Sequence, residues 1–188
     1  MTSFTIACVS NFTNGCYGAP YDSDRYDILN AEIHKQIETI LKEHEAQLTD
    51  TITFLFGGGM GGEYTCFLAV QQWKQHPPKP WDAYTYRTVV LHPYQNYKTF
   101  ALRQDLSFVT TMREQADQFS LLYNRERKSQ TDLFDRDREI ITRSHVVLLL
   151  IDAVKIRRDS FRAPFYAKNQ SKKIYIINPI QLRINQLS

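Results

Sequence analysis

Six short stretches rich in β-branched and aromatic residues recur along the chain, and most of them are continuous apolar runs. Continuous runs are typical of strands buried on both faces of a parallel sheet, whereas half-exposed strands alternate apolar and polar residues. The strands predicted from these runs are Phe4–Val9, Ile52–Phe56, Thr88–Leu91, Phe119–Tyr123, Val146–Ile151 and Ile174–Ile177.

Helical periodicity separates the predicted strands. It is clearest between Asp24 and His44, where one apolar face is formed by Tyr26, Leu29, Ile33, Ile37, Ile40 and Leu41. Further helices are predicted from the glycine cluster to about Gln75, over Tyr97–Gln115 with a potential break near Ser107, and over Thr131–Arg143 and Phe161–Asn169. This alternation predicts a three-layer, Rossmann-like α/β fold, with a mostly parallel sheet of about six strands and helices on both faces.

The chain has 188 residues, of which 43% are hydrophobic and 23% are charged. This size predicts one domain over residues 1–188, with a polar tail from about residue 180, that folds without disulfides or a structural metal. The apolar runs are too short to span a membrane, and the N-terminus lacks the basic and apolar regions of a secretory signal. We therefore expect a cytoplasmic protein with no membrane partner.

The three cysteines, Cys8, Cys16 and Cys66, form no C-x-x-C pair and have no histidine at ligand spacing. This pattern favours reduced thiols over a zinc site or a disulfide framework. No metal site is predicted, and the sequence identifies no cofactor.

Charge is distributed unevenly between the two halves of the chain. Residues 1–94 carry six basic and ten acidic residues, whereas residues 95–188 carry 17 basic and ten acidic residues. Anion binding would therefore draw on the second half, most densely at Arg125, Arg127, Lys128, Arg136, Arg138, Arg143, Lys155, Arg157, Arg158 and Arg162. The interleaved acidic residues leave solvated helix faces as the alternative.

Five of the seven glycines, Gly57, Gly58, Gly59, Gly61 and Gly62, fall within six residues between a predicted strand and a predicted helix. Such a cluster indicates a backbone that turns through positive φ and closely approaches a ligand. The N-terminus of the following helix suits a phosphate or carboxylate. The motif lacks the Lys-Ser/Thr pair of a Walker loop, which disfavours ATP hydrolysis. Tight packing between strand and helix is the alternative explanation for the glycines.

Five blocks in the order LFGGGMGGEY, LHPYQ, REQADQFSLLY, DRDREIITRSHVVLLLID and KKIYIINP resemble the YpsA-like branch of the SLOG superfamily, over about residues 4–179. This superfamily includes the DNA-processing protein DprA and the LOG phosphoribohydrolases. The resemblance implies a Rossmann-like fold that binds nucleotides or nucleotide-derived ligands. It implies a first ligand loop at Gly57–Gly62, with Glu63 at the acidic position that follows.

The chain departs from this superfamily in two places. Relatives carry a second glycine loop after the fifth strand, whereas DAVKIRRDSFRAPF contains no glycine, so Arg157, Arg158 and Ser160 would have to supply charge and a hydroxyl there. The P-G-G-x-G-T-x-x-E motif of LOG enzymes is also absent from the sequence. The first departure counts against a phosphate cradle of backbone amides at that loop, and the second counts against phosphoribohydrolase activity.

Open α/β sheets bind ligands at the carboxyl ends of their strands. The candidate ligand-binding residues are therefore Ser10, Asn11, Gly57, Gly58, Gly59, Met60, Gly61, Gly62, Glu63, Pro93, Tyr94, Arg125, Asp152, Arg158 and Ser160. Glu63 is also the candidate catalytic residue, as a general base or an acceptor for a ribose hydroxyl, unless it only complements the helix dipole. Tyr94 and Tyr123 would stack on a base or belong to the core. His92 is the histidine nearest the predicted crevice, with a structural role as the alternative.

Three functions fit these residues. The first is a cytoplasmic binding or sensor domain for a nucleotide or nucleotide derivative, held by the glycine loop. The second is a hydrolase that cleaves an N-glycosidic or phosphoester bond of a nucleotide through Glu63. The third is single-stranded nucleic-acid binding of the DprA kind, through arginines between residues 125 and 162. The resemblance also implies a homodimer.

Overall fold

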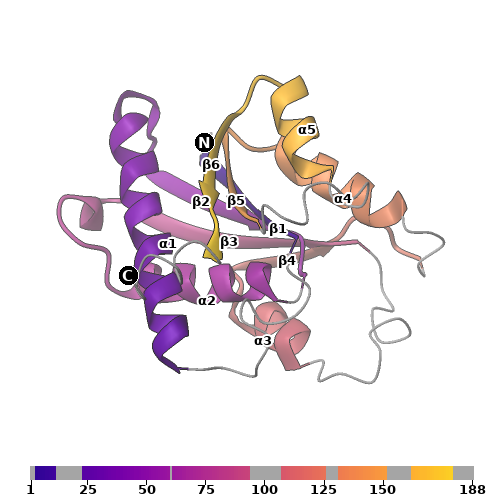
Figure 1. Ribbon diagram of the computed structural model, residues 1–188, viewed down its shortest axis with the longest axis horizontal. Coiled ribbons are helices and arrows are strands. Elements are labelled where there is room, and N and C mark those ends of the chain that lie inside the picture. Colours follow the sequence, from indigo (N-terminus) through magenta and orange to yellow (C-terminus); the bar gives the residue numbers. More distant parts are fainter. Residues whose placement is uncertain are drawn as a thin grey trace.

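The computed structural model describes residues 3–11, 23–59, 61–93, 107–125, 131–151 and 162–179, and all structural statements refer to these ranges. Strands and helices alternate along the chain (Figure 1). The strands are β1 (Phe4–Ser10), β2 (Thr51–Phe56), β3 (Thr85–His92), β4 (Gln118–Leu121), β5 (Val146–Leu150) and β6 (Lys173–Ile177). The α-helices are α1 (Ser23–Glu43), α2 (Gly62–Gln75), α3 (Ser107–Gln115), α4 (Thr131–Thr142) and α5 (Ala163–Asn169).

The six strands form one parallel sheet in the order β4-β3-β2-β1-β5-β6. Cys8 of β1 is level with Phe56 of β2 and with Leu148 of β5, so these three strands end close to the same height. The chain first adds strands on one side of β1 and then crosses to add β5 and β6 on the other side. This confirms the predicted parallel sheet of about six strands.

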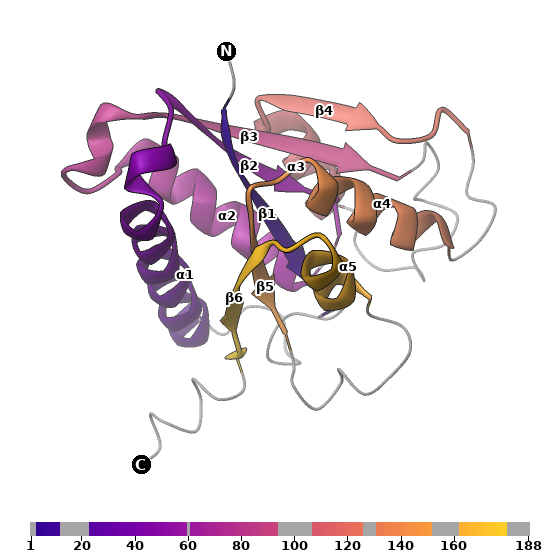
Figure 2. The same cartoon turned by 90° about the horizontal axis from the view of Figure 1, so that it is seen from above.

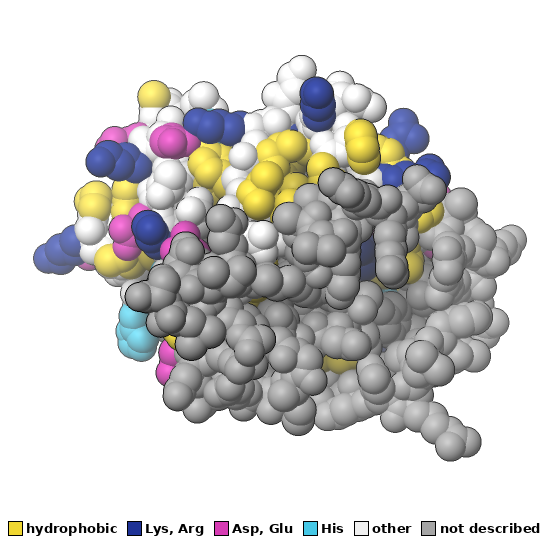
Figure 3. Space-filling model, viewed as in Figure 1, with side chains coloured by type: hydrophobic (Ala, Val, Ile, Leu, Met, Phe, Trp, Pro, Cys, Tyr) yellow, Lys and Arg dark blue, Asp and Glu magenta, His cyan; other side chains and the backbone are white. Residues whose placement is uncertain are grey.

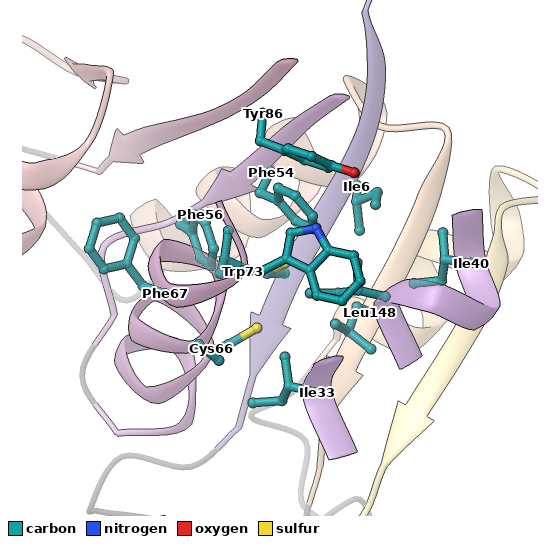
Figure 4. Packing of buried hydrophobic residues seen from close by; sticks show 14 of the residues in the cluster. Ile6, Ile33, Ile40, Phe54, Phe56, Cys66, Phe67, Trp73, Tyr86 and Leu148 are labelled. Atoms are coloured by element: carbon teal, nitrogen blue, oxygen red, sulfur yellow. The ribbon is translucent and has the colours of Figure 1, made fainter. Parts of the chain in front are cut away.

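Helices cover both faces of the sheet, as predicted (Figure 2). On one face, α1, α2 and α3 enclose the larger core, in which Trp73 of α2 packs beside Phe54 and Tyr86 of the sheet (Figure 4). On the other face, α4 and α5 enclose a smaller core that includes Ile140, Ile141, Val147 and Leu149. Apolar residues on both faces of β1, β2 and β5 explain why these strands read as continuous apolar runs.

The apolar face predicted for the first helix is the buried face of α1, except that Tyr26 is only half-buried. Its residues Leu29, Ile33, Ile37, Ile40 and Leu41 are all at most 1% exposed, whereas Lys35 and Glu38 face outward. The remaining helices are shorter than α1. In the described part of the chain, none of the helices has the combination of length and apolar character that crossing a membrane requires.

The boundaries of three elements differ from the prediction by two or three residues. β3 begins at Thr85 rather than Thr88, because Tyr86 is buried between the exposed Thr85 and Arg87 and so breaks the continuous apolar run. β4 lies at the sheet edge and is only half buried, which shifts its bounds from Phe119–Tyr123 to Gln118–Leu121. α5 begins at Ala163, with Pro164 in its first turn, where proline is tolerated. The predicted helical segment 97–106 lies outside the described residues.

Candidate functional site

The strand order places a topological switch point between β1 and β5. From β1 the chain leaves toward α1 on one face of the sheet, whereas α4 and α5 cover the other face. In sheets of this kind the ligand crevice lies at the carboxyl ends of the strands beside the switch point. Ser10 and Asn11 end β1 there, and the main-chain N–H of Asn11 donates to the carbonyl oxygen of Leu150 in β5 at 3.4 Å.

The glycine loop follows β2, which is the neighbour of β1, so it lies at the same edge as Ser10 and Asn11. Its backbone turns through positive φ at Gly58 and at Gly61, both at 73°. Gly61 is the N-cap of α2 and provides no side-chain cap for the first turn of that helix. The structure therefore brings together the predicted residues Ser10, Asn11, Gly57–Gly59 and Gly61–Glu63. Met60 lies outside the described residues.

Side chains of the protein itself crowd the first part of this loop. A β-carbon added to Gly57 would lie 2.5 Å from Nε of Arg136, and one added to Gly58 would lie 2.5 Å from Nδ1 of His92. Both distances are far below van der Waals contact. The close approach of Arg136 and His92 is therefore sufficient to require glycine at these two positions, and the role predicted for these glycines in ligand binding stays a prediction.

The carboxylate of Glu63 lies against the inner side of the loop. Glu63 is 2% exposed, and its carboxylate accepts hydrogen bonds from the main-chain N–H groups of Gly57 and Gly59. The prediction that the loop leaves its N–H groups open to a ligand is therefore wrong for these two residues. A general base must reach its substrate, and a carboxylate buried on the loop does not favour the catalytic role predicted for Glu63.

Arg136 and Asp137 of α4 complete a buried charge cluster with Glu63. Nε and Nη2 of Arg136 donate to Oδ1 of Asp137 at 2.8 and 2.5 Å, and Nη1 donates to the carbonyl oxygen of Gly57 at 3.5 Å. Burial raises the pKa of Glu63 and of Asp137, and the positive charge of Arg136 opposes both shifts. A single guanidinium thus balances two buried carboxyl groups directly beneath the loop.

His92 ends β3 on the other side of the loop. It is 2% exposed, and its ring stacks on Phe119 with a centroid distance of 5.7 Å. Burial, reinforced by the charge of Arg136, lowers the pKa of His92 to about 4. The imidazole is therefore neutral at pH 7, so His92 supplies no positive charge for a phosphate.

Asp137 is absent from the predicted site residues, and Arg136 is named only within the basic stretch expected to bind anions, although the sequence does contain a signal that both are buried. Arg136 precedes Ile140 by four residues, and Asp137 precedes Ile141 by four residues. Side chains four residues apart lie on the same face of a helix. Charged residues of opposite sign that share a helix face with apolar residues therefore indicate a buried ion pair.

Arg125, predicted to contact phosphate, is engaged by an acidic residue. Its guanidinium donates from Nη1 and Nη2 to the two carboxylate oxygens of Asp132, both at 3.0 Å, and lies 4.3 Å from the ring centroid of Tyr123. The Tyr123 hydroxyl donates to Oδ2 of Asp135 at 3.0 Å. Arg125 thus links the segment after β4 to the start of α4, and its side chain is 32% exposed.

The remaining predicted site residues divide into two groups. Pro93 follows β3, and its carbonyl oxygen accepts the main-chain N–H of Tyr123 at 3.2 Å, so it joins the ends of β3 and β4. Four predicted residues, Tyr94, Asp152, Arg158 and Ser160, lie outside the described residues, as does Arg157. Their predicted roles stay predictions.

Two cysteines lie below the loop, in the core. Cys8 of β1 and Cys66 of α2 are both free and fully buried, and their thiols form a hydrogen bond. Burial raises the pKa of the Cys8 thiol well above its usual range, which makes this thiol a poor nucleophile. Cys16 lies outside the described residues. Within the described ranges, no group of three or more His, Cys, Asp or Glu residues could hold a metal ion.

The N-terminus of α2, where Gly62 and Glu63 are buried, adds main-chain donors to this edge of the sheet. The N–H groups in the first turn of a helix have no intrahelical acceptor, and the helix dipole adds partial positive charge. In α2 these groups belong to Gly62, Glu63 and Tyr64, next to the residues that end β1. An anion placed there would contact these main-chain donors.

Comparison with known proteins shows similarity at the level of the fold. No protein-family model and no curated protein sequence matches the chain. One similar solved structure is DNA processing protein A from Helicobacter pylori, reported for its single-stranded DNA binding mode. The TM-score is 0.52 and the sequence identity is 16%; the match covers 94% of this chain but only 66% of that one. The chain therefore has a parallel, three-layer Rossmann-like fold similar to that of DNA processing protein A.

Proposed function

We propose that this chain is a binding domain for a nucleotide or nucleotide derivative, which it holds by a phosphate at the N-terminus of α2. The observation that carries the proposal is the uncapped first turn of α2, which begins in a glycine loop beside the switch point between β1 and β5. Membership of the YpsA-like branch of the SLOG superfamily, which the sequence motifs suggest, is part of this proposal.

In this proposal Glu63 and the phosphate use different donors. The Glu63 carboxylate accepts the N–H groups of Gly57 and Gly59 from the buried side and so holds the loop in shape. The phosphate takes the first-turn N–H groups of α2, and Ser10 and Asn11 bring a hydroxyl and an amide to the same edge. Arg136 offsets the negative charge of Glu63 below the site, which reduces its repulsion of a bound phosphate.

Calorimetric titration with nucleoside mono-, di- and triphosphates, and with inorganic phosphate, tests this function. We expect at least one nucleotide to bind, and Asn11→Asp to weaken that binding about tenfold, which corresponds to about 1.4 kcal/mol. The matched control is Gln75→Glu, which adds the same charge at the opposite end of α2, about 20 Å away. Absence of binding by every phosphate-bearing compound would overturn the proposal, as would an equal loss in both variants.

Single-stranded DNA binding is the second candidate, and the fold similarity to DNA processing protein A favours it. In this case the phosphate at α2 would belong to a DNA strand. Fluorescence anisotropy with a labelled oligothymidylate, measured over a range of salt concentrations, separates the two functions. A DNA-binding domain would bind the oligonucleotide more tightly than free nucleotides, with affinity that falls steeply as salt rises. Binding of free nucleotide alone would exclude this candidate.

A further inference from the structure

A groove of about 480 Å³ lies where α1, α2 and α3 meet. Its lining consists of Tyr26 and Asp27 near the start of α1, Leu68 and three glutamines of the C-terminal half of α2, and Gln115 at the end of α3. Small-molecule sites have volumes of roughly 300 to 1,000 Å³, so the groove is large enough for a small ligand. None of these residues belongs to the site proposed at the N-terminus of α2.

Asp27 is the one charged residue in the described lining of the groove. Two other acidic residues of α1 have basic partners, since Glu32 lies 3.7 Å from Nζ of Lys35 and Glu43 lies 2.6 Å from Nζ of Lys173. Figure 3 shows basic and acidic side chains interspersed at the upper left of the molecule, where α1 ends. Asp27, in contrast, forms no ion pair with any residue that the structure describes, so its carboxylate can accept hydrogen bonds from a ligand.

Two glutamines of the groove have already used one half of their amide group. Nε2 of Gln71 donates to Oγ1 of Thr88 at 3.2 Å and to the carbonyl oxygen of Gln115 at 2.9 Å, which leaves Oε1 of Gln71 as an acceptor. Oε1 of Gln72 accepts a hydrogen bond from Nδ2 of Asn30, which leaves the NH₂ group of Gln72 as a donor. The groove therefore presents both acceptors and donors.

A buried acceptor lies next to these glutamines. Oδ1 of Asn30 is buried and has no hydrogen-bond partner among the described residues. Buried polar atoms nearly always have a partner, because an unmade hydrogen bond costs free energy. This oxygen belongs to the amide group that binds Gln72 of the groove lining. A donor group of a ligand at this end of the groove would satisfy it.

We propose that this groove binds a neutral ligand rich in hydroxyl groups, namely a saccharide. A hydroxyl both donates and accepts hydrogen bonds, so neighbouring hydroxyls match the acceptors of Asp27 and Gln71 and the donor of Gln72. Tyr26 and Leu68 line the same groove, and their aromatic and aliphatic side chains suit the apolar C–H face of a sugar ring. This site is independent of the proposed nucleotide site.

The mixture of donors and acceptors argues against three other classes of ligand. A phosphate only accepts hydrogen bonds, and the carboxylate of Asp27 would repel it. An ammonium group only donates, so it would leave the NH₂ group of Gln72 unmatched. The edge of a nucleobase holds its donors and acceptors in one plane, whereas the groups of this groove come from three helices.

Nuclear magnetic resonance of the isotope-labelled full chain tests this site through the side-chain NH₂ signals of the glutamines. The probes are neutral mono- and disaccharides, among them glucose, galactose, mannose and maltose. We expect at least one of them to shift these signals saturably. Asp27→Asn keeps the shape of the side chain but removes its charge, and it should weaken binding about tenfold, as expected for a hydrogen bond to a charged group. The matched control is Glu139→Gln in α4, which covers the other face of the sheet and should leave binding unchanged.

A second variant, Gln75→Ala, removes one amide group from the groove and should also weaken binding. Circular dichroism checks that each variant is folded. The proposal would be overturned by the absence of saturable shifts with every saccharide at millimolar concentration, or by equal affinity in the wild type and folded Asp27→Asn. Binding of butylammonium or adenosine in place of every saccharide would likewise overturn it. Asn11→Asp, which tests the nucleotide site, should leave saccharide binding unchanged, so the two proposals fail separately.

Discussion

The carboxylate of Glu63 accepts the main-chain N–H of Gly57, six residues earlier in the chain. Glu63 belongs to α2, the helix that follows the glycine loop, and Gly57 is the first residue of the loop. The helix therefore supplies the carboxylate that binds the first N–H group of the loop. Many glycine loops keep such N–H groups for a phosphate. Here the N–H groups of Gly57 and Gly59 are satisfied internally, so an external anion would have to use other main-chain donors, among them those of the first turn of α2.

Replacing Glu63 by glutamine should destabilise the protein. The carboxylate offers two acceptor oxygens to the N–H groups of Gly57 and Gly59. A glutamine amide offers only one acceptor oxygen, and its NH₂ group is a donor that cannot accept a hydrogen bond. We expect a loss of about 1.5 to 3 kcal/mol in the free energy of unfolding, the range for hydrogen bonds to a charged group. Urea denaturation measures it. An unchanged denaturation midpoint would show that the carboxylate does not hold the loop.

Removing the charge of Arg136 should cost more, because Asp137 would be left buried without its partner. We expect Arg136→Met to lower the free energy of unfolding by about 3 to 5 kcal/mol. The double variant Arg136→Met/Asp137→Leu removes this ion pair, and the part of the loss that comes from Asp137 should be recovered, whereas Glu63 still lacks the charge of Arg136. If the two single changes and the double change are additive in a double-mutant cycle, the two side chains are not coupled.

Stability should fall with acidification because of His92. Its pKa is lowered to about 4 in the folded protein, against 6.5 for the unfolded chain, so the unfolded state takes up the proton first. The contribution of His92 to stability is present above pH 6.5 and is lost as the pH falls toward 4, where the loss reaches about 3 kcal/mol. The buried carboxyl groups Glu63 and Asp137 have raised pKa values and act in the opposite direction.

A comparison with His92→Phe isolates this effect. Phenylalanine keeps a ring against Phe119 but does not titrate. Subtracting the variant's free energy of unfolding from that of the wild type at each pH removes the carboxyl contributions common to both proteins. The difference should decrease between pH 6.5 and 4. A difference that stays constant over this range would mean that His92 titrates normally in the folded state.

Gly58 should tolerate no side chain. Alanine there would be strained at a φ of 73°, and its β-carbon would lie 2.5 Å from Nδ1 of the buried His92. We expect Gly58→Ala to cost about 2 to 4 kcal/mol, the combined range of backbone strain and overpacking. Combining it with His92→Ala removes the clash but keeps the strain, so the double variant should be less destabilised than the sum of the single variants. Thermal and urea unfolding would measure this coupling.

Much of the fold could be predicted from the sequence because burial leaves a periodic trace. The apolar residues of α1 recur every three to four positions, and the runs in β1, β2 and β5 are continuous because both sheet faces are covered. The prediction was weaker for β4 at the edge of the sheet, where one-sided or partial burial leaves no continuous run. The placement of the glycine loop between a strand and a helix is a local property and was also predictable.

The environment of that loop was not predictable, since it depends on residues distant in the chain. Arg136 contacts Gly57, although the two residues are 79 positions apart in the sequence, and His92 at the end of β3 lies beside Gly58, which follows β2. By itself the sequence determined which segments are strands and helices, and that a glycine turn joins β2 to α2. Only the tertiary structure decided that Glu63, Arg136 and His92 occupy the inner side of this turn, because strand order and helix packing set which side chains meet, and local periodicity does not record that order.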